Sequence, residues 1–325
     1  MPDSGFAIRS YRRSVRTSFF LVLFLVLIGG VVRSTGAGLG CPDWPKCFGL
    51  WIPPTQISEI PVKFWDHPLS SEHGKIIFNP VKTWTEYLNR LLGVVIGFAI
   101  LIQAALSLFY SKRPKARFFS VLSLVLVIFQ GWLGARVVST DLRPFVISLH
   151  LLVALFIALS LLAALFYSKE KPEYRPPYVA SSYLKPLVIS SSVFLLIQFF
   201  LGTEVRSQVD VLFREFDFGL REQYADRLDW KLMVHRSFSI LIILFLFLQF
   251  RLSGRQLKLD EIWFAGLPPV LVIFLVLSGI ILIYLRFPAF VQPFHLLFGF
   301  SVICSQFWLC LYLFFRSGDH RTASD

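Results

Sequence analysis

Residues 134–150, GARVVSTDLRPFVISLH, indicate how the chain is organised, because a second version of this stretch occurs later in the sequence. Residues 279–295 are GIILIYLRFPAFVQPFH. Each stretch begins with a glycine, contains Leu-Arg and ends with a histidine sixteen positions after the glycine. Both connect the end of one apolar segment to the start of the next through a short turn. This match indicates an internal repeat.

Two further pairs of residues extend the repeat toward the N-terminus. Asn89-Arg90 corresponds to His235-Arg236, and Arg33-Ser34 corresponds to Arg206-Ser207. The three offsets are 145, 146 and 173 residues, so the first copy has 27 more residues between its first and second helices. We therefore predict a duplicated four-helix unit with a histidine expected at four equivalent positions. Asn89 occupies one of the four.

The composition indicates an integral membrane protein. Of the 325 residues 55% are hydrophobic, and the mean hydropathy is +0.65. Runs of about 20 apolar residues cross a bilayer as helices. Eight such runs are present, at 17–33, 87–110, 117–139, 146–167, 185–206, 232–252, 262–285 and 291–315. We predict an all-α membrane protein of two repeated four-helix bundles, related by a pseudo-twofold axis along the membrane normal.

The net charge of +12 follows from membrane topology and does not indicate nucleic-acid binding. The basic clusters lie at 9–16, 112–117, 169–185, 251–258 and 316–321. Because cytoplasmic loops carry the excess of lysine and arginine, both termini are predicted to be cytoplasmic. The chain is predicted to be a multi-pass protein of the bacterial cytoplasmic membrane.

These features divide the chain into five parts. A polar, basic cytoplasmic tail at 1–16, expected to have little order, precedes an N-terminal bundle at 17–168 with an external loop at 34–85. A cytoplasmic linker at 169–184 leads to a C-terminal bundle at 185–315, whose external loop is expected at 207–230. A cytoplasmic tail follows at 316–325.

The external loop holds two of the four cysteines. Cys41 and Cys47 lie on the predicted oxidising side of the membrane, where a disulfide is the default expectation. Short external disulfides can also exchange, so a redox function stays open. Cys304 and Cys310 lie in the last helix and are expected to be small core residues.

Residues 29–54 fit the pattern GGxxRxTGxGLxCPDWPxCxGxxIPP, which resembles the first external loop of the haem A synthase family. Glu86, Tyr87 and Arg90, the segment 130–150, His235-Arg236 and His295 follow in the family's order. The resemblance covers about residues 17–315 and is to the bacterial type. It implies oxidation of the C8 methyl of haem O to the formyl of haem A, for assembly of terminal oxidases.

Histidines inside membrane spans are functional candidates by default, because an unpaired polar group there is costly. Imidazoles from facing helices of a bundle are a standard means of holding haem iron. We predict that His235 and His295 are axial ligands of a resident haem b in the C-terminal half. The alternative is a hydrogen-bonded interhelical histidine without a haem.

The N-terminal half is predicted to bind the substrate haem O. Its ligand position holds Asn89 where many relatives have histidine, and asparagine is a poor iron ligand, so His150 is the single candidate ligand. One axial position is then open to water or an oxygen species, or this half is impaired. The resemblance implies that Glu86 is the catalytic carboxylate. The alternative is an interfacial acid at a helix N-terminus.

Four arginines also obey the repeat: Arg33, Arg90, Arg206 and Arg236. Guanidinium binds carboxylate in a bidentate fork, so these residues are candidates to anchor haem propionates. Snorkelling to lipid headgroups is the competing explanation.

Several expectations concern partners and alternatives. A haem O synthase is the expected substrate donor, and the electron acceptor and any homo-oligomer are left open. A non-catalytic haem b protein of the same fold, suggested by Asn89, is one alternative function. A transporter is another, although no helix is interrupted by glycine or proline at corresponding positions of the two halves.

Overall fold

The computed structural model describes residues 4–64, 71–72, 75–76, 78–168, 183–215, 227–254 and 259–315. Within these residues it is helical apart from loops and one two-stranded hairpin. The chain divides into two compact units, Met1–Ser168 and Lys169–Asp325. Residues 169–182 of the predicted linker (169–184) and the predicted C-terminal tail (316–325) fall outside the described residues.

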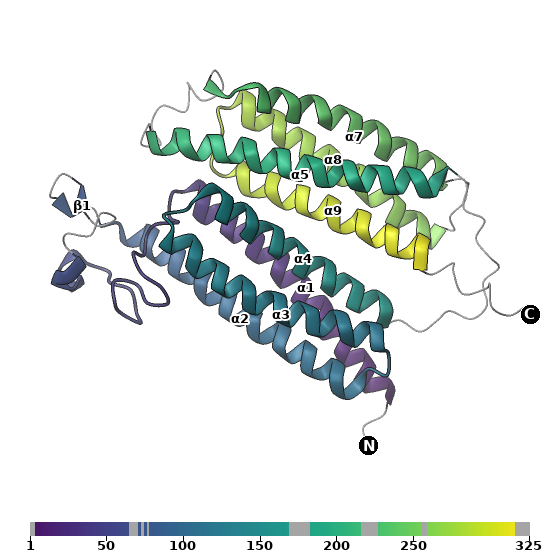
Figure 1. Cartoon of the computed structure of the whole chain (residues 1–325), viewed down its shortest axis with the longest axis horizontal. Helices are drawn as coiled ribbons and strands as arrows, with labels where there is room; N and C mark the ends of the chain where they lie inside the picture. Colours follow the sequence, from purple (N-terminus) through teal and green to yellow (C-terminus); the bar gives the residue numbers. More distant parts are fainter. Residues whose placement is uncertain are drawn as a thin grey trace, which may run out of the picture. The chain divides into compact units, whose positions relative to one another are not determined.

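The first unit is a bundle of four long helices (Figure 1). They are α1 (Ser4–Ser34), α2 (Pro80–Tyr110), α3 (Pro114–Ser139) and α4 (Pro144–Ser168). Between α1 and α2 the external loop contains the short helices η1 (Ile57–Glu59) and η2 (Val62–Phe64) and the hairpin of β1 (Ser71–Glu72) and β2 (Lys75–Ile76). Proline at the first turn sets where α2 and α3 begin.

The second unit is also a four-helix bundle. It contains α5 (Leu184–Glu215), α7 (Trp230–Gly254), α8 (Leu259–Tyr284) and α9 (Val291–Phe315). Eight of the described helices are long and apolar enough to cross a membrane, which confirms the predicted all-α class with eight spans. Helix α8 continues through Pro268 and Pro269. The pseudo-twofold relation between the units stays a prediction.

The turns that define the repeat share their backbone conformation. Asp141 and Leu142, between α3 and α4, have positive φ angles of 50° and 57°, and Arg286 and Phe287, between α8 and α9, have 60° and 58°. These positions differ by the same 145 residues as the histidines. The two Leu-Arg dipeptides differ by 143 residues. They therefore occupy different places in the turn, and the backbone is the feature that repeats.

The expectation of a poorly ordered N-terminal segment is wrong for residues 4–16, which form the first turns of α1. Tyr11 and Val15 are fully buried, and the Tyr11 hydroxyl lies 2.7 Å from Ser120 Oγ on α3. Arg12 Nε donates to the Ser168 carbonyl at the end of α4 (3.2 Å). These inward contacts stabilise the helix although its outer face is basic.

The second external loop is also shorter than predicted. Helix α5 extends to Glu215, so the expected loop at 207–230 begins later, and residues 216–226 fall outside the described residues. Val209 and Leu212 are buried in a cluster with Leu282 and Phe287. This apolar face keeps α5 helical beyond the predicted span.

The first external loop packs on the start of α2. Cys41, Cys47, Phe48 and Ile60 form a buried cluster, against which Tyr87 and two phenylalanines pack. Farther along, the Glu59 carboxylate accepts the Thr55 backbone N–H (2.6 Å), and this hydrogen bond lowers the pKa of Glu59. The loop is therefore a folded cap on one end of the first unit.

Candidate functional site

In the second unit, His235 of α7 and His295 of α9 face each other with ring centroids 6.5 Å apart. Metal–imidazole nitrogen bonds are about 2 Å long and a ring nitrogen lies roughly 1.2 Å from the ring centre, so two imidazoles on opposite sides of one iron place their centres roughly 6.4 Å apart. The observed spacing matches this value. These two residues therefore fit a six-coordinate haem.

A hydrogen bond orients the His295 ring, whereas His235 Nδ1 is buried without a hydrogen-bond partner among the described residues. His295 Nδ1 lies 2.9 Å from Ser278 Oγ, and the same hydroxyl donates to the Leu275 carbonyl (2.8 Å). This arrangement leaves Nε2 of His295 for a metal and follows the usual pattern, in which a ligating histidine donates its other N–H to a neighbour. Gln198 Nε2 donates to the His235 carbonyl (3.0 Å) and fixes the α7 backbone at that histidine.

Two glycines allow the rings to lie close to neighbouring helices. A Cβ added at Gly202 would lie 3.3 Å from His235 Cε1, and one added at Gly279 would lie 3.2 Å from His295 Cε1. Both distances are shorter than ordinary contacts between carbon atoms of about 3.5–4.0 Å. A side chain at either glycine would therefore require the facing histidine ring to move by a few tenths of an ångström.

In the first unit, His150 of α4 has a similar setting. A Cβ at Gly134 would lie 3.6 Å from His150 Cε1, and Gln130 Nε2 donates to the His150 carbonyl (3.1 Å). His150 Nδ1 is buried and has no hydrogen-bond partner among the described residues. Asn89 Oδ1 is also buried and has no hydrogen-bond partner among the described residues. Two buried polar atoms at these equivalent positions fit a site for a haem and its ligand.

Glu86 is buried and holds the external loop. One carboxylate oxygen accepts the Cys41 backbone N–H (3.0 Å), and the other accepts a hydrogen bond from Arg90 Nη2. Arg90 Nη1 donates in turn to the carbonyls of Asp43 (2.7 Å) and Lys46 (3.0 Å). The carboxylate therefore joins α2, the helix that also carries Asn89, to the external loop. A catalytic function of Glu86 stays a prediction.

The predicted disulfide is confirmed between Cys41 and Cys47. It closes the segment whose carbonyls Arg90 binds. Cys304 and Cys310 are free thiols; Cys304 is buried, as expected, and Cys310 is partly exposed, with its sulfur 3.3 Å from Ser192 Oγ.

The four arginines of the repeat lie in different settings. Arg90 is bound to Glu86 and to the loop. Arg206 Nη1 lies 4.0 Å from Asp210 Oδ2 in α5, and Arg236 is exposed. Arg33 lies in the last turn of α1. Propionate anchoring stays a prediction for all four.

Gln198 and Ser278 could not be predicted from the sequence because neither obeys the repeat. Leu25 and Leu133 occupy the equivalent positions. In contrast, the sequence contains a pattern that predicts two of the glycines at the site, because a glycine stands sixteen residues before both His150 and His295. Each of these glycines faces its histidine ring.

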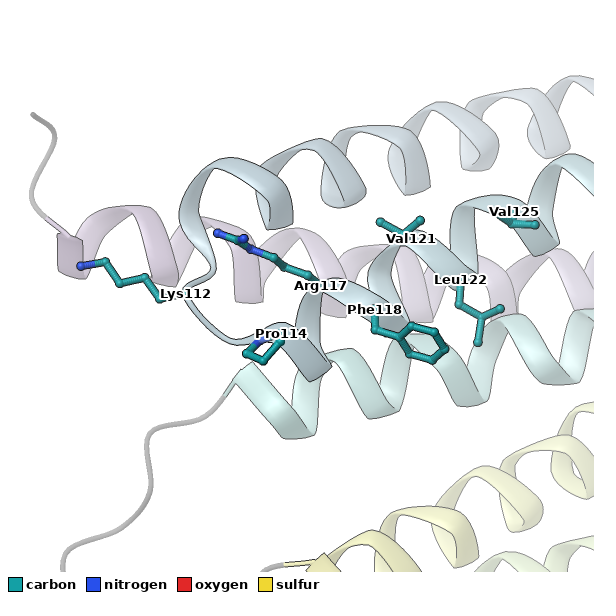
Figure 2. A pocket seen from close by; sticks show the side chains of 7 residues that line it. All are labelled: Lys112, Pro114, Arg117, Phe118, Val121, Leu122 and Val125. Atoms are coloured by element: carbon teal, nitrogen blue, oxygen red, sulfur yellow. The ribbon is translucent and has the colours of Figure 1, made fainter.

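The described cavities lie outside the predicted site residues. A groove of about 570 Å³ lies along the start of α3, with Lys112 and Arg117 toward one end and Phe118, Val121 and Val125 farther along (Figure 2). A smaller cavity of about 260 Å³ lies between the loop residues 42–44 and the end of α3. None of the predicted ligand residues lines either one.

Comparison with known proteins gives the family. A family model described as "Cytochrome oxidase assembly protein" (COX15-CtaA) matches residues 12–307. A protein named Heme A synthase from Shewanella oneidensis is 32% identical over 193 residues, 58% of this chain and 54% of that protein. One of the same name from Shouchella clausii is 28% identical over 189 residues, 57% of this chain and 55% of that protein.

A third relative covers more of the chain. The Heme A synthase of Bacillus pumilus is 24% identical over 319 residues, 92% of this chain and 90% of that protein. The chain thus spans about half the length of the first two relatives in those alignments and nearly all of the third. Because the family model covers every predicted site residue of both units, the chain belongs to the COX15-CtaA family of cytochrome oxidase assembly proteins, the haem A synthase family.

Proposed function

We propose that the chain is a bacterial haem A synthase, which oxidises the C8 methyl group of haem O to a formyl group and so supplies haem A for terminal oxidases. Family membership and the names of the relatives support this function. The first unit binds and oxidises haem O. The second unit holds haem b, which transfers single electrons when bound.

The difference between the two units at equivalent positions carries this assignment. Glu86 of the first unit corresponds to Leu232 of the second, at the same offset of 146 residues that relates Asn89 to His235. Oxidising a methyl group to a formyl group with an oxygen from water releases protons and electrons. The separate electron acceptor takes the electrons, so the reacting site also needs a proton acceptor. A site that only transfers electrons needs none. The buried carboxylate therefore marks the first unit as the reacting half.

Each side chain has a defined task in this proposal. His235 and His295 hold haem b, and Ser278 fixes the His295 ring. His150 binds the iron of haem O. Glu86 receives protons on its carboxylate oxygens, and Arg90 keeps that carboxylate in place beside the substrate.

The proposed orientation places the disulfide loop outside the cell. Arg12 contacts the end of α4 at Ser168, so the basic start of α1 and the end of α4 lie at one end of the first unit. The disulfide loop lies at the opposite end (Figure 1). The positive-inside rule makes the basic end cytoplasmic, and a disulfide suits the oxidising side. A haem O synthase as donor and a separate electron acceptor complete the proposed partners.

Haem analysis tests the function directly. The full chain is expressed with and without a haem O synthase, and its haems are extracted and separated by chromatography. We expect haem A or its hydroxylated intermediate only when haem O is supplied. Glu86→Gln should abolish that product and leave haem b in place, because the amide oxygen can still accept the Cys41 N–H. Glu204→Gln, at an exposed carboxylate, is the matched control and should retain the product.

One outcome favours the non-catalytic alternative suggested by Asn89. Haem b alone under both conditions, in a folded protein with its disulfide intact, would show a haem-binding relative without synthase activity. A colourless protein would contradict both functions.

A further inference from the structure

Three histidines of the two units share one packing arrangement. His150, His235 and His295 each direct Cε1 at a glycine of a neighbouring helix, at 3.6, 3.3 and 3.2 Å from the position of an added Cβ. The glycines are Gly134, Gly202 and Gly279, respectively. A ring packed against a glycine is therefore the common feature of the predicted ligand positions.

The fourth position keeps the glycine and lacks the ring. Gly29 corresponds to Gly202 at the offset of 173 residues, and Asn89 corresponds to His235 at the offset of 146. A Cβ added at Gly29 would meet no atom of the described residues within 4 Å, apart from neighbouring backbone of its own helix. The contact that the His235 ring makes at Gly202 is therefore absent at Gly29, where the corresponding residue is the shorter asparagine.

The polar group left at this position needs a hydrogen-bond donor. Asn89 Oδ1 is buried and has no partner among the residues that the structure describes. A buried acceptor left unpaired costs about 1–3 kcal/mol, and inside a membrane no bulk water offsets this cost. A small ligand with an O–H or N–H group would satisfy the oxygen and occupy the open space together.

We infer that the space beside Gly29 and Asn89 is a binding site for a small proton-carrying Lewis base, of the water or imidazole class, which takes the axial position of the substrate haem opposite His150. This inference rests on the proposed function, since it requires haem O in the first unit. The second unit offers no such site, because His235 and His295 would together hold the iron of a haem there. The two units therefore differ in ligand exchange as well as in their acidic residue.

The differing ligand sets predict differing spectra. A haem with two imidazole ligands is low-spin and does not exchange them readily, whereas a haem with one imidazole and a weak ligand is high-spin and accepts added bases. The protein is purified with a haem O supply, and its haems are counted per chain. The oxidised form is then titrated with imidazole and followed by absorption and electron paramagnetic resonance. We expect imidazole to convert one haem per chain from high-spin to low-spin.

A second probe tests the hydrogen bond to Asn89. 1-Methylimidazole bound through its free nitrogen has no N–H left to donate to Oδ1. It should bind roughly two- to tenfold more weakly than imidazole, the range of one neutral hydrogen bond. Equal affinity for the two probes would remove Asn89 from the proposed site.

Two variants complete the test. Asn89→His restores the residue of the repeat and should give two low-spin haems without an imidazole response. Leu88→His places the same side chain at an exposed neighbouring position and should keep the response. If Asn89→His does not fold, the imidazole titration of the unaltered chain still tests whether one haem has an open axial position.

The outcomes separate the two proposals. Haem O or haem A present as a second, low-spin haem that ignores imidazole would overturn the open axial site and leave the proposed function standing. A chain that binds haem b alone despite the haem O supply would overturn the proposed function and this inference with it.

Discussion

Replacing Gly40 with alanine tests whether backbone packing holds the external loop against α2. A Cβ at Gly40 would lie 2.6 Å from the Lys82 carbonyl oxygen, 2.7 Å from its carbon and 2.8 Å from Thr83 N. All three are backbone atoms of the first turn of α2, which Pro80 and the Asn79 cap hold in place (Lys82 N to Asn79 Oδ1, 3.1 Å). The loop must therefore move, by up to about 1 Å to restore an ordinary contact.

This movement breaks two hydrogen bonds. Thr83 Oγ1 donates to the Gly40 carbonyl (2.8 Å), and the Cys41 N–H donates to Glu86 Oε2 (3.0 Å). A neutral hydrogen bond contributes about 0.5–1.5 kcal/mol and one to a charged group about 1.5–3, so the variant should lose about 2–4 kcal/mol. At about 2–4 °C per kcal/mol for a unit of this size, the unfolding temperature should fall by roughly 5–15 °C.

The assay is thermal unfolding in detergent, together with hydrogen exchange at the Cys41 amide. Gly38→Ala is the matched control in the same loop, because its Cβ would lie 3.4 Å from Leu142 Cδ1, a side-chain end that can shift. We expect the control to behave as the unaltered chain. An unchanged unfolding temperature and unchanged exchange for Gly40→Ala would refute the close packing.

Two further predictions concern the second unit. Gly279→Ala should weaken haem b retention roughly five- to a hundredfold, because overpacking costs about 1–3 kcal/mol and moves the His295 ring. Haem transfer to an acceptor protein measures this retention. Gly29→Ala, whose added Cβ meets no atom within 4 Å, is the control and should retain haem b, so equal losses in both variants would contradict the packing argument. Ser278→Ala removes the acceptor of His295 Nδ1 and should lower haem b affinity about tenfold or more and raise its reduction potential. Ser278→Thr, which keeps a hydroxyl, should have the haem b affinity and reduction potential of the unaltered chain. An equal reduction potential in the unaltered chain and both variants would show that this hydrogen bond does not affect the haem.

Much of the fold was predictable because apolar runs of bilayer length leave few alternatives. Hydropathy located all eight spans, and the spacing of the repeat identified the three histidines. Helix ends were less predictable. The basic start of α1 and the end of α5 are helical because Tyr11, Val209 and Leu212 are buried by other helices, which composition along the chain does not reveal.

Hydropathy, spacing and residue type were enough to predict the all-α class, the eight spans, the Cys41–Cys47 disulfide and a set of four related positions that holds three histidines and Asn89. What each of these four positions contacts depends on how the helices pack. The His235 and His295 rings lie at a spacing that fits one iron, each packs against a glycine where an added Cβ would be closer than an ordinary contact, and Glu86 is bound to the external loop. These contacts join segments that are far apart in the chain, so the distances between their atoms depend on how the helices pack, and no local sequence pattern encodes them.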